Sequence, residues 1–343
     1  MSRTNVRFVV CLLLICSAAA VVPASAQHFE QIPGSLNYIS AGRSEVWGIL
    51  CTAVYCSDSN VYRFNSGTKK FVQVAGPPNG LQSIVVGGGS LLEPDEVWGI
   101  ENISYNVYRF NFAKGVFVQV PGLTLSQIAV GYGNLDKCHP YEVWGVWGPN
   151  VANPATYRYN YCTSGFDNIP NIDYEGTVYL SQIATGGGDV WAIGNGQVWE
   201  YYVDESSSPA WWGPGPADNA LSGVEQISVG VNDVWAVSSY PIYQILNWAP
   251  STQYDIYGVT LGVSANQTAT GGDGVWVIYD TSGANGLIAR YDFQLGINSG
   301  EYGSGGFSPP FSLTSPAVQI AVGSGAGVWA IDTENRVYAF VRP

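Results

Sequence analysis

Histidine, methionine and charged residues are scarce in this chain. Of its 343 residues, two are histidine, one is methionine and 11% are charged. His28 lies beside a predicted processing point and His139 is next to Cys138. These two histidines cannot be combined into a metal site or a serine–histidine–aspartate triad. We therefore expect no metal ion and no cofactor.

Basic residues are also few. Lys and Arg total 13 against 26 Asp and Glu, which gives a net charge of −13. An acidic surface repels phosphate backbones, so we predict no nucleic-acid partner. The same composition is rich in Gly, Trp and Tyr. That balance is typical of sheets that are packed on both faces.

Long apolar runs are missing except at the start of the chain. Arg3 and Arg7 precede an apolar stretch at 8–22, and Ala24-Ser25-Ala26 follows as a small-residue cleavage site. The pattern predicts a secretory signal peptide at 1–26. About 15 apolar residues are short for a bilayer span. We therefore expect a single mature domain at 27–343, secreted or periplasmic/extracellular, with no membrane insertion.

Four cysteines lie in the predicted mature domain: Cys51, Cys56, Cys138 and Cys162. An even number in an exported chain favours two disulfides over a metal site. Three connectivities are possible. If each bridge is local, Cys51 pairs with Cys56 and Cys138 pairs with Cys162.

A Val-Trp pair recurs seven times, and successive tryptophans are 41 to 53 positions apart. The pairs are Val46-Trp47, Val97-Trp98, Val143-Trp144, Val190-Trp191, Val234-Trp235, Val275-Trp276 and Val328-Trp329. Each repeat reads as four strand-length pieces, such as 126–131, 142–146, 157–160 and 166–170 in the third. No stretch has sustained helical periodicity. The sequence predicts an all-β fold, a β-propeller of four-stranded antiparallel blades.

The two ends of the repeat array complement each other. Residues 29–34 form a fourth-strand phrase without the first three strands, and 319–340 form three strands without a fourth. The N-terminal strand is therefore expected to complete the last blade and close the ring of seven blades, which removes open sheet edges. The fourth strands near Trp211-Trp212 and at 254–259 are degenerate. Six blades plus an irregular segment is the alternative.

The repeat phrase resembles a known family. The phrase at 117–131, followed by Val-Trp-Gly-Ile and Val-Tyr-Arg-Phe-Asn in other repeats, is similar to the tectonin β-propeller repeat of tachylectin-like proteins. The resemblance covers nearly all of 28–343. It implies a secreted or surface-exposed lectin that binds bacterial or O-methylated glycans at several similar sites.

Aromatic residues outside the repeated phrase are the candidate ligand contacts. We expect the seven in-strand tryptophans to fill the core, whereas aromatic faces in turns can pack against sugar rings and neighbouring amides can bond hydroxyl groups. The carbohydrate-binding candidates are Tyr105, Asn106, Trp147, Asn150, Trp211, Trp212, Tyr240 and Trp248.

Acidic and basic residues recur in register in three repeats: Glu45 with Arg63, Glu96 with Arg109, and Glu142 with Arg158. Where the acid becomes Asp189 or Asp233, the Arg position becomes Glu200 or Gln244. Paired gain and loss predicts an ion pair between strands or blades. The alternative interpretation is a polar floor for a bound glycan.

Two functional hypotheses follow. The first is a secreted, lectin-like propeller that recognises glycans on cell surfaces or glycoproteins without catalysis. The second is a secreted scaffold that binds a protein partner across one face. Acid pairs such as Asp95/Glu96 match the residue types of a glycosidase, but nothing in the sequence distinguishes them from turn residues. We therefore predict that the chain is not an enzyme.

Overall fold

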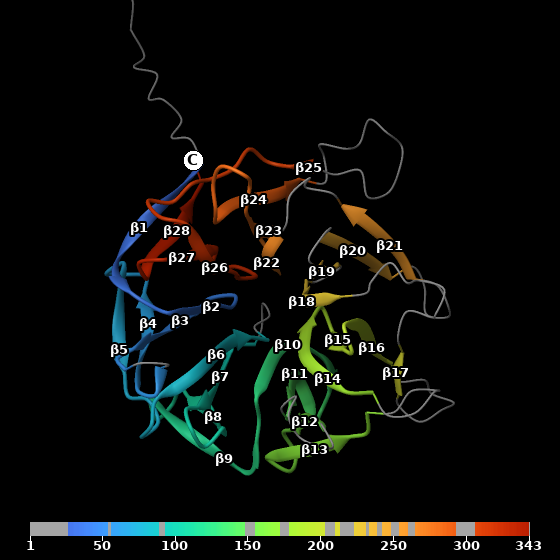
Figure 1. The fold of residues 1–343 in the computed structure, drawn as a ribbon. Coiled ribbons are helices and arrows are strands. Elements are labelled where there is room, and N and C mark those ends of the chain that lie inside the picture. Colours follow the sequence, from blue (N-terminus) through green and yellow to red (C-terminus); the bar gives the residue numbers. More distant parts are fainter. Residues whose placement is uncertain are drawn as a thin grey trace, which may run out of the picture.

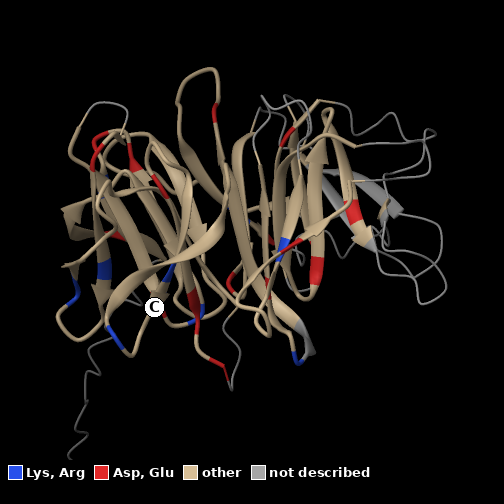
Figure 2. Cartoon of the chain, turned by 90° about the horizontal axis from the view of Figure 1, so that it is seen from below, with Lys and Arg blue, Asp and Glu red and all other residues tan. Residues whose placement is uncertain are grey.

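The computed structural model describes residues 27–53, 56–88, 93–147, 155–171, 178–202, 210–212, 223–230, 233–238, 242–247, 254–259, 265–292 and 306–342. The predicted signal peptide lies outside these ranges. Charged residues are few and widely spaced along the ribbon (Figure 2).

Within the described residues, the strands form seven four-stranded sheets arranged around a central axis (Figure 1). Blade 1 contains β2 (Tyr38–Ala41), β3 (Val46–Cys51), β4 (Ser59–Asn65) and β5 (Lys70–Val74). Blade 2 contains β6 (Leu81–Gly87), β7 (Glu96–Glu101), β8 (Asn106–Asn111) and β9 (Val116–Thr124). Blade 3 contains β10 (Gln127–Asp136), β11 (His139–Val146), β12 (Thr156–Asn160) and β13 (Gly165–Ile169).

The remaining blades follow the same order from the axis outward. Blade 4 contains β14 (Leu180–Gly186), β15 (Asp189–Gly194), β16 (Gln197–Tyr202) and β17 (Ala210–Trp212). Blade 5 contains β18 (Val224–Val229), β19 (Val234–Ser238), β20 (Ile242–Asn247) and β21 (Tyr254–Val259). Blade 6 contains β22 (Ala265–Gly271), β23 (Gly274–Tyr279), β24 (Leu287–Asp292) and β25 (Gly306–Phe307). All described strand pairs are antiparallel, so the predicted four-stranded antiparallel blades of a β-propeller are confirmed.

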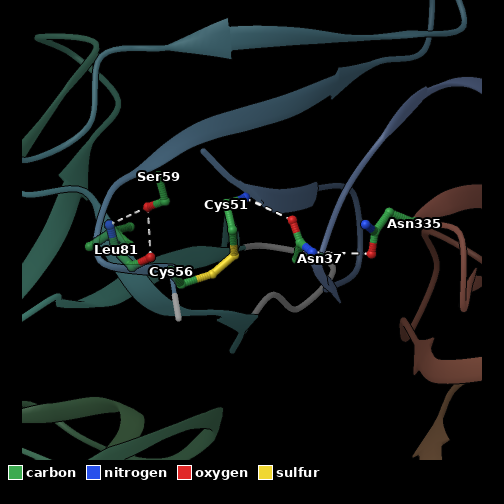
Figure 3. The surroundings of a disulfide bond; sticks show 6 residues. All are labelled: Asn37, Cys51, Cys56, Ser59, Leu81 and Asn335. Atoms are coloured by element: carbon green, nitrogen blue, oxygen red, sulfur yellow. Dashed lines mark hydrogen bonds between the residues drawn. A yellow bond between two sulfur atoms is a disulfide. The ribbon is translucent and has the colours of Figure 1, made fainter. Parts of the chain in front are cut away.

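Blade 7 joins the two ends of the described chain. It contains β26 (Ala317–Val322), β27 (Val328–Asp332), β28 (Arg336–Val341) and, as its outer strand, β1 (His28–Ser35). The β1–β28 register places His28 opposite Val341. Beside this blade, Asn37 Nδ2 donates to Asn335 Oδ1 over 3.1 Å (Figure 3). The first and last blades are therefore linked by side chains as well as by the β1–β28 ladder.

The Val-Trp tryptophans fill the space between neighbouring blades, as predicted. All seven are at most 4% exposed. The Trp47 ring lies edge-on to Phe110 of the next blade with centroids 4.7 Å apart, and Trp276 meets Phe340 in the same way. Edge-to-face aromatic pairs contribute beyond the area that they bury. The same aromatic contact recurs in six of the seven blade-to-blade contacts among the described residues, and the contact between blades 4 and 5 is the exception.

A glycine ends or follows the innermost strand in six blades, and in blade 3 the equivalent Gly131 lies within the longer β10. These glycines are Gly42, Gly87, Gly131, Gly186, Gly230, Gly271 and Gly323. A Cβ at position 271 would lie only 2.6 Å from the Val322 carbonyl oxygen of the next blade. Position 87 approaches the Val130 carbonyl oxygen in the same manner. Glycine is needed because neighbouring backbones come closest together here.

Glutamine side chains also join the innermost strands. In blades 3 to 7, a glutamine lies four positions before the glycine just described: Gln127, Gln182, Gln226, Gln267 and Gln319. Gln226 bonds both the amide and the carbonyl group of Thr268 in the next blade, at 2.7 and 2.8 Å. Gln319 bonds both groups of Ile39 and so links blade 7 to blade 1. We call this series the glutamine belt.

Candidate functional site

Both disulfide pairings match the sequence prediction. Cys51 pairs with Cys56 beside the end of β3, and Cys138 pairs with Cys162 across the turns that flank β11 and β12. The amide of Cys51 also donates to Asn37 Oδ1 over 2.8 Å (Figure 3). The first bridge therefore lies beside the contact between blades 1 and 7.

The three predicted acid–arginine pairs are also present. Arg Nε donates to the Glu carboxylate over 2.7 Å in blade 1, 2.6 Å in blade 2 and 2.9 Å in blade 3. Each carboxylate also accepts the indole N–H of the tryptophan two residues later. Burial opposes ionisation of Arg109, but its hydrogen bonds to Glu96 raise its pKa above the ordinary value. These groups satisfy one another, which indicates a structural pair rather than the floor of a ligand site.

The acids without an arginine partner behave differently. Burial raises the pKa of Asp189 above its usual value. Burial likewise raises the pKa of Asp233, although a hydrogen bond from Trp235 opposes the shift. Burial removes the water that stabilises a charged carboxylate, so it favours the neutral form of both acids.

Asp95 is a turn-capping residue. Its carboxylate accepts the amides of Arg43, Ser44 and Glu45 over 2.7 to 2.9 Å, across the boundary between blades 1 and 2. The adjacent Glu96 is held by Arg109. Both acids therefore have structural roles, which removes the candidate glycosidase pair.

The structure brings the predicted candidates Tyr105 and Trp147 together at the junction of blades 2 and 3, and the candidate Asn106 follows Tyr105 in the chain. The rings of Tyr105 and Trp147 are nearly perpendicular, at 85°, with centroids 5.8 Å apart. Tyr105 is 40% exposed and has a φ of 59°. Its backbone carbonyl oxygen accepts the amide of Leu125, which lies just before the first strand of blade 3. Asn106 Nδ2 donates to the buried Glu101 over 3.0 Å. We call Tyr105, Asn106 and Trp147 the aromatic junction.

The prediction that Trp211 contacts a ligand from an exposed turn is wrong. It lies in β17 and is fully buried, with its ring centroid 5.4 Å from Tyr201 and 6.1 Å from Trp144. A tryptophan buried between two blades fills the core and does not present a face to a ligand. Trp212 pairs through its backbone with Glu200. Asn150, Tyr240 and Trp248 lie outside the described residues.

Two hollows were not identified from the sequence. One, of about 430 Å³, lies on the axis at the glycine end of the innermost strands and includes Gly87, Tyr132, Thr185 and Thr270. No charged side chain is among its described lining residues. The other, of about 480 Å³, is a polar groove on blade 1 beside Asn60, Gln73 and Pro77. The recurring glycine was the only signal in the sequence for the first.

The described part of the chain lacks two features, a metal-ligand cluster and a membrane-spanning helix. No group of three His, Cys, Asp or Glu residues there is placed to hold a metal ion. No described helix is long and apolar enough to cross a membrane.

The sequence matches no protein-family profile and no curated protein. Solved structures are similar in fold. The RRP9 WD40 repeats match with a TM-score of 0.61 at 10% identity, over 94% of this chain and 99% of that one. Streptogramin B lyase matches with a TM-score of 0.59 at 13% identity, over 92% and 98%. YCF48 from Cyanidioschyzon merolae matches with a TM-score of 0.59 at 12% identity, over 91% and 98%.

These likenesses identify the class of the fold as a β-propeller of the kind that includes WD40 domains. At such low identity they carry no activity across, because one fold hosts many functions. One of the three similar structures is a lyase and another is a WD40 repeat domain. Function must therefore be argued from the residues of this chain.

Proposed function

We propose that this chain is an exported, non-catalytic, lectin-like propeller, and that the aromatic junction is a carbohydrate-binding site. The observation that supports this most is the pairing of the exposed Tyr105 with the half-buried Trp147, which come from two different blades. Aromatic faces pack against the C–H surfaces of sugar rings, and an adjacent amide can bond hydroxyl groups. Because the two rings are nearly perpendicular, one could stack on the face of a sugar ring while the other contacts its edge.

Three features of the sequence support the same function. The apolar segment with its cleavage site and the two disulfides are typical of an exported protein. The repeat phrase resembles tectonin repeats, which implies glycans on cell surfaces or glycoproteins as ligands. Asn150, Trp212, Tyr240 and Trp248 stay candidates for further sugar contacts.

A glycan array tests this proposal. Oxidised protein comprising residues 27–343 is screened against bacterial and O-methylated glycans, and binding is then measured for Tyr105→Ala and Trp147→Ala. Each variant should weaken binding about tenfold, the loss expected when one stacking contact is removed. Tyr179→Ala is the matched control, since Tyr179 is 48% exposed and lies in another blade. Equal binding by all three variants would contradict the assignment of the site.

A second candidate function is a protein-binding scaffold, favoured by apolar side chains on the rim of blades 1 and 2. They are Val72, Phe112, Val116 and Val118, which are 50%, 41%, 39% and 43% exposed. The Arg63 guanidinium lies 5.5 Å from the Phe112 ring, so the two rims meet. Exposed apolar patches of this kind mark interaction surfaces. A double change Val72→Asp with Val118→Asp that removes partner binding but keeps glycan binding would support this second function.

A further inference from the structure

Blade 6 keeps the arginine of the acid–arginine pairs but not the acid. Arg290 lies opposite Trp276 in the strand register, as Arg109 lies opposite Trp98. In blade 2 the residue two positions before the tryptophan is Glu96, whereas in blade 6 it is Gly274. Gly274 has a φ of +91°, which a side chain would strain. The backbone of blade 6 is therefore built without the carboxylate.

The Arg290 guanidinium has no partner among the described residues. Its Nε is buried and has no hydrogen-bond acceptor. Apart from the adjoining chain, only Nε and Nη2 of Arg290 lie within 4 Å of the place where a Cβ of residue 274 would stand, at 3.5 and 3.7 Å. In blades 1 to 3 the same two nitrogens hold the glutamate. In blade 6 these nitrogens lie beside a position that no side chain of residue 274 fills.

A second arginine lies beside this position. In blades 2 and 3, an aromatic residue three positions after the register partner of tryptophan packs on the arginine of the preceding blade: Phe112 on Arg63 and Tyr161 on Arg109. Ala339 is the register partner of Trp329 in blade 7, so the corresponding residue is Arg342. Arg342 reaches blade 6, because its Nη2 donates to Asp273 over 2.6 Å. Arg342 thus brings a second guanidinium to this side of blade 6, where it is paired with Asp273.

Arg290 is half-buried, but its buried Nε–H group has no acceptor, which costs free energy and is unexpected in a chain of net charge −13. We propose that blade 6 binds an oxyanion, the carboxylate of an acidic sugar, at Arg290 in the position that Glu96 occupies in blade 2. The planar fork of Nε and Nη2 fits the two oxygens of a carboxylate, and Arg342 adds attraction from the rim. The choice of an acidic sugar rests on the proposed function, but the anion site does not.

Titration with sodium glucuronate tests the site, with glucose at the same ionic strength as the neutral comparison. Binding is followed by calorimetry and by the ¹H–¹⁵N signal of the Arg290 Nε–H group. Glucuronate should bind and shift that signal, whereas glucose should not. Arg290→Gln should weaken glucuronate binding about tenfold or more, as expected for the loss of a charge-assisted bidentate contact. Arg290→Lys, which keeps the charge without the fork, should give an intermediate loss.

The matched control is Arg63→Gln, because this arginine occupies the same register position but is already neutralised by Glu45. It should leave glucuronate binding unchanged. Equal binding by wild type and Arg290→Gln, or no binding to wild type, would overturn the site. If acetate binds as tightly as glucuronate, the anion site is supported but its specificity for an acidic sugar is rejected. Loss of glycan-array binding in Trp147→Ala with intact glucuronate binding would show that the two sites are independent.

Discussion

The side-chain amide of Gln127 in blade 3 bonds both backbone groups of Ile183 in blade 4. Nε2 donates to the Ile183 carbonyl oxygen over 2.7 Å, and Oε1 accepts the Ile183 amide over 2.6 Å. The carboxamide thus acts as a short piece of backbone between two innermost strands that form no sheet with each other. Gln226 and Gln319 repeat the two-bond contact in blades 5 and 7, whereas Gln182 and Gln267 each accept one amide of the next blade. The glutamine belt is therefore one of the polar links that hold the ring together.

Removing one member of the belt should destabilise the whole ring. Gln127→Leu leaves the amide and carbonyl groups of Ile183 without their partners in a half-buried position. We expect a loss of about 2 kcal/mol in the free energy of unfolding, the cost of two hydrogen bonds and of the unpaired groups. Urea unfolding measures it. Gln73→Leu, which loses one bond to Asn60 on the exposed rim, should cost much less.

Blade 2 lacks the belt residue, and restoring it should stabilise the protein. Ser83 occupies the position of Gln127, and its hydroxyl group is buried without a hydrogen-bond partner. Ser83→Gln would reach the first strand of blade 3 and should raise the free energy of unfolding by about 1 kcal/mol. Ser83→Val separates two effects, because it removes the unpaired hydroxyl without adding a bridge. A Ser83→Gln variant no more stable than Ser83→Val would contradict the bridging role.

Features formed within one repeat could be predicted from the sequence, whereas contacts between neighbouring blades could not. The Val-Trp cores, both disulfides and the Glu96–Arg109 pair were readable because their partners lie within one blade or recur in register. The Gln127 contact joins residues 56 positions apart, and nothing within a single repeat indicates it. Tyr105 and Trp147 were each predicted, but only the packing of blade 2 on blade 3 brings them together. Trp211 was misplaced because its strand lacks the Pro-Gly ending that marks the fourth strands β1 and β9.

The two disulfides should differ in their effect on stability. In the chain-entropy description, a bridge stabilises by restricting the unfolded chain, and longer loops give more. Cys138 and Cys162 are separated by 24 positions, and Cys51 and Cys56 by 5. Replacing Cys138 and Cys162 by serine should cost about 3 kcal/mol, and replacing Cys51 and Cys56 should cost less. Denaturant unfolding of the two double variants checks the order, and the reverse order would contradict this account.

Asp332 should make the protein sensitive to acid. It is fully buried, and burial alone would disfavour its charge. Hydrogen bonds from the Arg336 side chain and amide, from the Tyr338 hydroxyl group and from the Glu334 amide outweigh burial and hold the pKa of Asp332 below its ordinary value. Because the folded state has the lower pKa, the stabilisation is fully present above the unfolded pKa of about 3.8.

Stability from Asp332 should then be lost as the pH falls through the folded pKa, where the carboxylate takes up a proton. Asp332→Asn keeps the shape of the side chain but cannot carry the charge. We expect its melting temperature to lie below that of the wild type at neutral pH and the gap to narrow as the pH is lowered below about 3.8. Thermal unfolding across this pH range measures the gap. A gap that is independent of pH would mean that shape and hydrogen bonding, rather than the Asp332 charge, stabilise this end of blade 7.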